Sequence, residues 1–167
     1  MEKSLENSSS FELSMEEENF LKEEIRKEQV QQDKELWSVF KDKNMKKVFE
    51  KYLNLKKKSS EAEQSWNSLQ MYIDIKKLQK SMLFSGKKAK KIMRKYLTEN
   101  ATNKVDIDVQ LDTKMPSRKM FDETLFKVVD LLHLRLDHFK ASYEYRNYIS
   151  SLKNQTMSDK LKKMMEL

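Results

Sequence analysis

Short polar segments alternate along the chain with stretches in which apolar residues recur every three or four positions. This spacing places the apolar side chains on one face of a helix, so the pattern predicts an all-α fold. Four stretches show the pattern clearly. Their apolar positions are Met45, Val48, Phe49, Tyr52 and Leu53; Ala62, Trp66, Leu69 and Ile73; Ala89, Ile92, Met93, Tyr96 and Leu97; and Phe121, Leu125, Val128, Val129 and Leu132.

Two more helices are expected toward the C-terminus. One contains Phe139, Tyr143, Ile149 and Leu152, and the segment 156–167 forms an amphipathic helix or tail. The apolar residues of that last segment share one side, and they are Met157, Leu161, Met164 and Met165. Because methionine adapts to irregular gaps, we interpret the methionines as residues that fill the core.

The N-terminal part of the chain is polar. Residues 1–12 contain a serine run, which predicts a disordered tail. Ser14 followed by Glu17 matches a capping box, so a long helix is expected within 13–41. The middle of that helix is weakly apolar, and we therefore expect only its ends to dock.

One stretch departs from the helical pattern. Val105, Ile107, Val109 and Leu111 alternate with polar residues, as in a strand. No second strand is apparent, and an unpaired strand edge is costly when buried. We therefore expect an ordered, extended loop between two helices.

Composition excludes several classes of function. One glycine cannot supply the turns of a sheet protein or a glycine-rich phosphate loop. The absence of cysteine excludes disulfides, cysteine zinc sites and thiol nucleophiles. His133 and His138 are five positions apart, which differs from the spacing of a helical metal pair. We expect a binding domain with no metal, cofactor or catalytic residue.

Charge is distributed unevenly within the net +7. Residues 1–36 carry 5 basic and 11 acidic side chains, whereas residues 37–167 carry 29 and 16. The basic body favours an acidic protein, an anionic membrane or a nucleic acid, although a solvated lysine-rich surface has the same composition. Nucleic acid is not expected, because the aromatic residues have core spacing and do not interleave with lysines.

A lysine run forms a second candidate site. Lys87, Lys88, Lys91 and Lys95 project from one side of a helix whose other side is apolar. They are candidates for phosphates or anionic phospholipid headgroups, or for calmodulin; an ordinary solvated face is the alternative. No apolar run has the about 18 residues of a membrane span, and we expect a cytoplasmic protein, peripheral to the membrane where these lysines bind it.

Three segments carry a resemblance to a known family. Residues 87–108 run from a lysine-rich helix through an aromatic turn into Val105-Asp106-Ile107-Asp108. Within 120–152, six positions fall in the register of the family's last motif: Phe121, Leu131, Leu132, Phe139, Ser142 and Tyr145. Residues 45–53 are similar to its opening helix. Over about residues 36–152 the chain therefore resembles a regulator-of-G-protein-signalling (RGS) domain, and some divergent members of that family lie in proteins with several copies.

The resemblance implies an RGS-like bundle of about nine helices in two subdomains, covering 42–155 and preceded by the long N-terminal helix. Such a domain binds the switch regions of a Gα subunit in its transition-state form. It accelerates GTP hydrolysis without performing chemistry, because a partner that prefers the transition-state conformation lowers the barrier. Gα supplies its own arginine and glutamine for the reaction.

The resemblance also implies where Gα would bind, namely at loops near 61–67, 104–110 and 134–142. The candidate Gα-binding residues are Gln64, Ser65, Trp66, Asn67, Asp106, Asp108, Arg135, His138 and Ser142. Asp106 stands where the family has asparagine, and this exchange removes the amide donors and adds a charge. Activation of GTP hydrolysis is therefore expected to be weakened or altered. The alternative is a pseudo-RGS scaffold that binds another protein, or an anionic membrane through the basic helix.

Overall fold

The computed structural model describes residues 12–111 and 114–166, and the tail predicted at 1–12 lies outside them except for residue 12. The predicted all-α class is confirmed, because the described residues contain helices and no strand. Six α-helices and one 3₁₀ turn are present there, so the expected number of about nine helices is not reproduced. The elements are α1 (Met15–Phe40), α2 (Lys43–Leu53), η1 (Leu55–Lys57), α3 (Ser60–Lys80), α4 (Gly86–Tyr96), α5 (Asp122–Lys140) and α6 (Tyr143–Met165).

Side-chain caps define most of the helix starts. The predicted capping box of α1 is confirmed, since Ser14 accepts a hydrogen bond from the Glu17 amide and the Glu17 carboxylate accepts one from the Ser14 amide. Asp42, Ser59, Ser85 and Ser142 cap α2, α3, α4 and α6, each through a side-chain oxygen that accepts one hydrogen bond from a backbone amide. Each cap satisfies a backbone donor that the helix leaves unpaired, which fixes where the helix begins.

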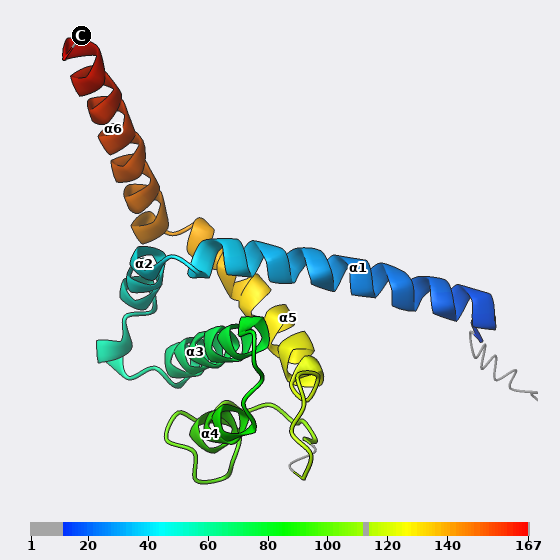
Figure 1. Ribbon diagram of the computed structural model, residues 1–167. Coiled ribbons are helices and arrows are strands. Elements are labelled where there is room, and N and C mark those ends of the chain that lie inside the picture. Colours follow the sequence, from blue (N-terminus) through cyan, green and yellow to red (C-terminus); the bar gives the residue numbers. More distant parts are fainter. Residues whose placement is uncertain (1–11, 112–113, 167) are drawn as a thin grey trace, which may run out of the picture.

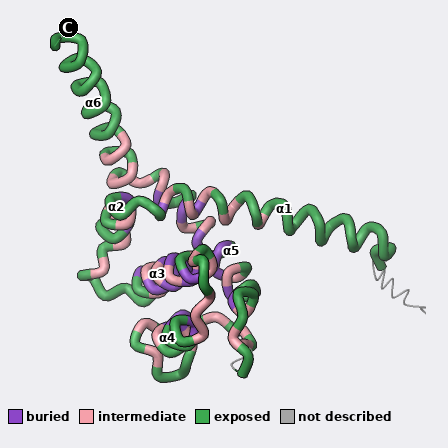
Figure 2. Tube along the Cα trace, viewed as in Figure 1, coloured by how far each residue is buried: buried purple, intermediate pink, exposed green. Residues whose placement is uncertain are grey.

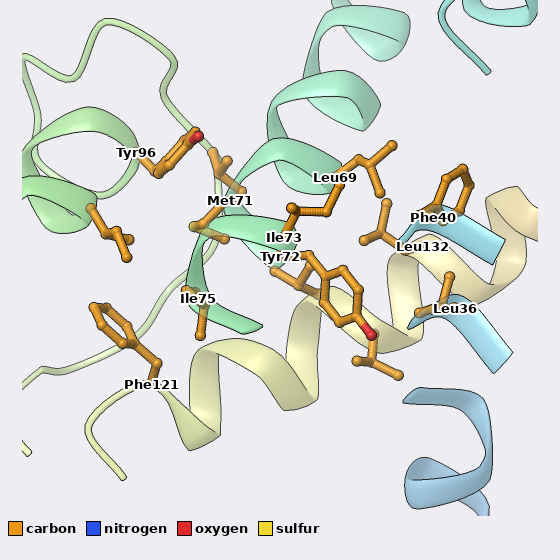
Figure 3. Packing of buried hydrophobic residues seen from close by; sticks show 14 of the residues in the cluster. Leu36, Phe40, Leu69, Met71, Tyr72, Ile73, Ile75, Tyr96, Phe121 and Leu132 are labelled. Carbon is orange, nitrogen blue, oxygen red and sulfur yellow. The ribbon is translucent and has the colours of Figure 1, made fainter. Parts of the chain in front are cut away.

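Helix α3 is the centre of the fold (Figure 1). It packs against α2, α4 and α5, while α1 packs against α5. Its buried side chains point in several directions, so neighbouring helices cover more than one side of it; they include Leu69, Met71, Tyr72, Ile73 and Ile75 (Figure 3). A helix buried on several sides has no single apolar stripe, and its long axis becomes the axis of the core.

An aromatic cluster joins four helices. The Phe49 ring lies 5.1 Å from Phe40 and 5.1 Å from Phe139, and Phe139 lies 5.2 Å from Tyr145. Phe40, Phe49 and Phe139 are almost fully buried. The cluster therefore connects the end of α1 with α2, the end of α5 and the start of α6.

Two buried tyrosines are held by carboxylates. The Tyr72 hydroxyl donates to Asp33 Oδ1 at 2.5 Å, and the Tyr96 hydroxyl donates to Asp74 Oδ2 at 2.6 Å. Burial, followed by the hydrogen bond to the carboxylate, raises the pKa of both phenols far above the usual value. Both groups stay neutral donors, so each buried hydroxyl has a satisfied hydrogen bond.

The connection between α4 and α5 contains the stretch with alternating polarity. No strand forms over Val105–Leu111, and the expected extended loop is confirmed. Val105 is buried, and its amide donates to the Tyr96 carbonyl at 2.8 Å. The loop is thus attached to the end of α4 and contributes Val105 to the core.

The boundary between the last two helices lies at a different position than the sequence predicted. Tyr143, Ile149 and Leu152 share α6 as expected, but Phe139 belongs to α5, so the predicted helix is wrong for Phe139. Ser142 caps the start of α6. The boundary expected between residues 155 and 156 lies within α6. From residue 150 onward α6 is exposed, which also contradicts the core role assigned to the methionines there (Figure 2).

Helix α1 packs only through its C-terminal part. Residues 12–28 are exposed, whereas Leu36 and Phe40 are buried (Figure 2). The expectation that both ends of this helix dock is therefore wrong for the N-terminal end. Helices α1 and α6 leave the bundle in different directions (Figure 1).

Candidate functional site

Gln64 connects the start of α3 to the loop after α4. Its side-chain amide donates to the Lys104 carbonyl at 2.9 Å, and its Oε1 accepts from the Asp106 amide at 3.0 Å. These two bonds use the donor and the acceptor of one side-chain amide, and they hold the backbone on both sides of Val105. The Asp106 side chain is exposed, so its carboxylate faces solvent at a fixed position.

Arg135 connects α5 to the same end of α3. Its guanidinium forms an ion pair with the Glu61 carboxylate, which lies in the first turn of α3. Glu61 is largely exposed, so the pair contributes little to stability. The pair shows that the C-terminal half of α5 lies beside the first turn of α3.

The loop also contacts α5 further along. Lys127 Nζ donates to the Asp108 carbonyl oxygen. Segments of α3, residues 104–108 of the loop after α4, and α5 therefore meet in one surface, which we define by Glu61, Gln64, Asp106 and Arg135 and name the α3–loop–α5 surface. His138 is exposed and lies three positions after Arg135, on the same side of α5.

Several candidate Gα-binding residues lie elsewhere. The loop expected at 61–67 is wrong, because these residues form the first two turns of α3. Ser65 and Asn67 are buried there, and Trp66 packs against the core. They support α3 and present little surface to a partner.

The third predicted loop is also mostly helical. Residues 134–140 complete α5, and only Ala141 and Ser142 connect it to α6. The Ser142 hydroxyl donates to the Phe139 carbonyl at 2.6 Å and accepts from the Tyr145 amide at 3.3 Å. Ser142 therefore ends one helix and begins the next.

The lysines of α4 fall into two groups. Lys87, Lys88 and Lys91 are exposed and form no ion pair with the described part of the chain. Lys95 differs, since its Nζ lies 3.7 Å from Asp74 Oδ2 and 5.1 Å from the centre of the Tyr96 ring. Three of the four lysines are thus free to meet an anion.

Sequence reasoning missed that lysines of α2 and α3 influence one another electrostatically. Burial lowers the pKa of Lys46, the charges of Lys77 and Lys43 lower it further, and Asp74 opposes the shift. Lys46 and Lys77 lie on different helices, so no spacing in the sequence could have indicated their proximity.

A polar contact between α1 and α5 was also missed. Glu35 accepts a hydrogen bond from Lys140 Nζ at 2.5 Å, and its other oxygen lies 3.1 Å from His133 Nε2. The bond from Lys140, followed by that from His133, lowers the pKa of Glu35. His133 therefore contacts a structural carboxylate, and within 12–111 and 114–166 no three His, Asp or Glu side chains gather as a metal site would require.

None of the described helices combines the length and the apolar character needed to cross a membrane. No family model, no curated protein and no solved structure matches this chain.

Proposed function

We propose that the chain is a divergent RGS-like domain that binds the switch regions of a Gα subunit through the α3–loop–α5 surface. One observation supports this most directly. Gln64 bonds to Lys104 and Asp106, and Glu61 pairs with Arg135, so three segments that the resemblance assigns to Gα binding lie together. Gln64 lies 40 positions before Lys104 and 42 positions before Asp106 along the chain.

The proposed mechanism requires no chemistry from this chain. A rigid surface that fits the transition-state conformation of the switch regions better than the ground state lowers the barrier to hydrolysis. The two hydrogen bonds of Gln64 supply rigidity to the loop. Asp106 presents only acceptors where the family has an amide, so contacts that need a donor are lost and activation is weak.

The direct test is retention of Gα subunits by the immobilised full chain. A panel of Gα classes is offered in the GDP, GTP-analogue and GDP–aluminium fluoride states. We expect retention of at least one class, strongest in the aluminium fluoride state, which resembles the transition state. If no class is retained in any state, the proposed function is wrong.

Asp106→Asn tests the assigned register of the loop. Restoring the amide should strengthen Gα binding about tenfold, the effect of about one hydrogen bond. Glu50→Gln is the control, because it exchanges a carboxylate for an amide at an exposed position of α2 outside the proposed surface. Equal affinities of Asp106→Asn and the unmodified chain would remove Asp106 from the interface.

A second candidate function is a scaffold that binds an anionic membrane through α4. Lys87, Lys88 and Lys91 favour it, because they are exposed and form no ion pair with the described residues. Co-sedimentation with vesicles rich in phosphatidylserine tests it, with neutral vesicles as the reference and calmodulin as a competitor. Binding should fall with added salt and in the triple variant Lys87→Glu, Lys88→Glu, Lys91→Glu.

A further inference from the structure

Two helical segments lie outside the bundle and have complementary properties. Residues 15–30 of α1, which we name the outer α1 segment, and residues 150–165 of α6, the outer α6 segment, each contain 16 residues. Each therefore measures about 24 Å as a helix. Apart from a partly buried Gln29, every residue in them is exposed, although both segments carry apolar side chains.

The outer α6 segment carries an apolar stripe with a positive border. Met157, Leu161 and Met164 follow helical spacing and are 56–71 % exposed. The segment has four lysines against one aspartate, and none of the lysines forms an ion pair with the described residues. The stripe and its charges remain unused within the monomer.

The outer α1 segment forms one wall of a groove. It diverges from α5, and the groove between them has a volume of about 1060 Å³. Its apolar lining consists of Ile25, Val30, Leu125, Phe126 and Val129. The outer α1 segment has six glutamates against three basic residues, and Glu16 and Glu23 form no ion pair with the described part of the chain.

We propose that the outer α6 segment of one copy docks in the α1–α5 groove of a second copy, and that the exchange is reciprocal. The outer α6 segment is basic, the outer α1 segment that forms the groove wall is acidic, and both carry exposed apolar residues. The charged lining of the groove has three acidic side chains, Glu23, Asp33 and Asp122, against the two basic ones of Lys22 and Arg26. The two segments point away from each other within one chain (Figure 1), so α6 does not reach its own groove. A two-fold pair uses both α6 segments and both grooves and leaves no unpaired end.

The first measurement is the mass of the full chain in solution by sedimentation equilibrium over a wide concentration range. We expect a dimer of twice the 20.1 kDa chain mass, which dissociates as salt is raised because opposite charges meet at the interface. A monomer at every concentration overturns the proposal. This result does not depend on Gα binding, so the two proposals fail separately.

Charge exchange identifies the surfaces involved. The α6 variant Lys153→Glu with Lys160→Glu and the α1 variant Glu16→Lys with Glu23→Lys change exposed residues seven positions apart, so each pair lies on one helix face. Each variant alone should dimerise at least about tenfold more weakly. An equimolar mixture should recover the dimer, because both interfaces then pair opposite charges.

A second pair of variants tests the contribution of apolar side chains to the proposed dimer. Leu161→Glu with Met164→Glu should abolish the dimer while the far-ultraviolet circular dichroism stays that of a folded helical protein. The control Met82→Glu with Leu83→Glu changes two exposed apolar residues between α3 and α4 and should leave the dimer intact. If the Glu16→Lys, Glu23→Lys variant still dimerises at full strength, the outer α1 segment is not part of the interface and the groove assignment is wrong.

Discussion

Glu35 links two helices through a single carboxylate. Its oxygens contact Lys140 and His133, both on α5, while Glu35 itself lies on α1. The lowered pKa of Glu35 means that the folded state favours the ionised carboxylate more than the unfolded state does. A group with this shift stabilises the fold above the ordinary pKa of glutamate, and the contribution is lost as pH falls through the lowered value.

The lowered pKa of Glu35 predicts how the stability of a Glu35→Gln variant depends on pH. At neutral pH the variant should unfold at a lower urea concentration than the unmodified chain, because the charged contacts to α5 are lost. The difference should shrink as pH falls below the ordinary range of glutamate, since the unmodified carboxylate is then protonated too. Urea unfolding at neutral and acidic pH measures this, with the exposed Glu50→Gln as control. A difference that does not change with pH would contradict the assigned charge state.

Gln64 shows at the same scale how one neutral side chain organises a surface. Its amide satisfies a carbonyl and an amide of the loop that contains Asp106. Because glutamine offers both a donor and an acceptor, an exchange to glutamate would remove the bond to the Lys104 carbonyl. The position of Asp106 thus depends on a residue 42 positions earlier.

At the scale of the element, two serine caps have different surroundings. Ser14 begins the outer α1 segment, whose neighbours are exposed, whereas Ser142 begins α6 next to the buried Phe139. A cap stabilises the whole protein only where the turn that it supports is packed against the rest. Helices without such packing are marginal even when they are well capped.

The substitutions Ser14→Ala and Ser142→Ala should therefore behave differently. Ser142→Ala should lower the free energy of unfolding by about 1 kcal/mol, because the cap is part of the aromatic cluster's support. Ser14→Ala should leave that free energy nearly unchanged and should accelerate amide exchange in the first turns of α1. Chemical denaturation and hydrogen exchange measure the two effects. Equal losses of global stability in both variants would show that the start of α1 is packed.

At the scale of the whole molecule, the core is built around α3 and includes only part of α1. Leu36 is fully buried in that part of α1, while Leu134 on α5 is 60 % exposed. The same substitution at these two sites shows how much of its effect on stability comes from burial, because the side chain removed is identical. Truncation of a buried leucine removes apolar contact and leaves a cavity, whereas truncation of an exposed one does neither.

Leu36→Ala should lower the free energy of unfolding by about 2–5 kcal/mol, and Leu134→Ala by less than about 0.5 kcal/mol. Thermal and urea unfolding at low protein concentration measure both. A small effect of Leu36→Ala would mean that α1 is peripheral along its whole length, and that the core is formed by the remaining helices.

The sequence by itself determined the helical class, the capping box at Ser14 and the extended loop at 105–111. These features depend on neighbours within one or two turns, so spacing and capping chemistry are enough to predict them. The break at Ser142 was missed because Phe139 and Tyr143 are four positions apart and look like one helical face.

Only the tertiary structure decided which apolar faces are buried. The spacing of Met157, Leu161 and Met164 resembles that of core helices, yet this stripe is exposed because no other helix lies beside it. The sequence also could not predict three contacts between distant residues, namely Gln64 with Asp106, Glu61 with Arg135 and Glu35 with Lys140. Each pair is separated by at least 42 positions, and a contact over that distance is fixed by how the helices pack rather than by any local pattern.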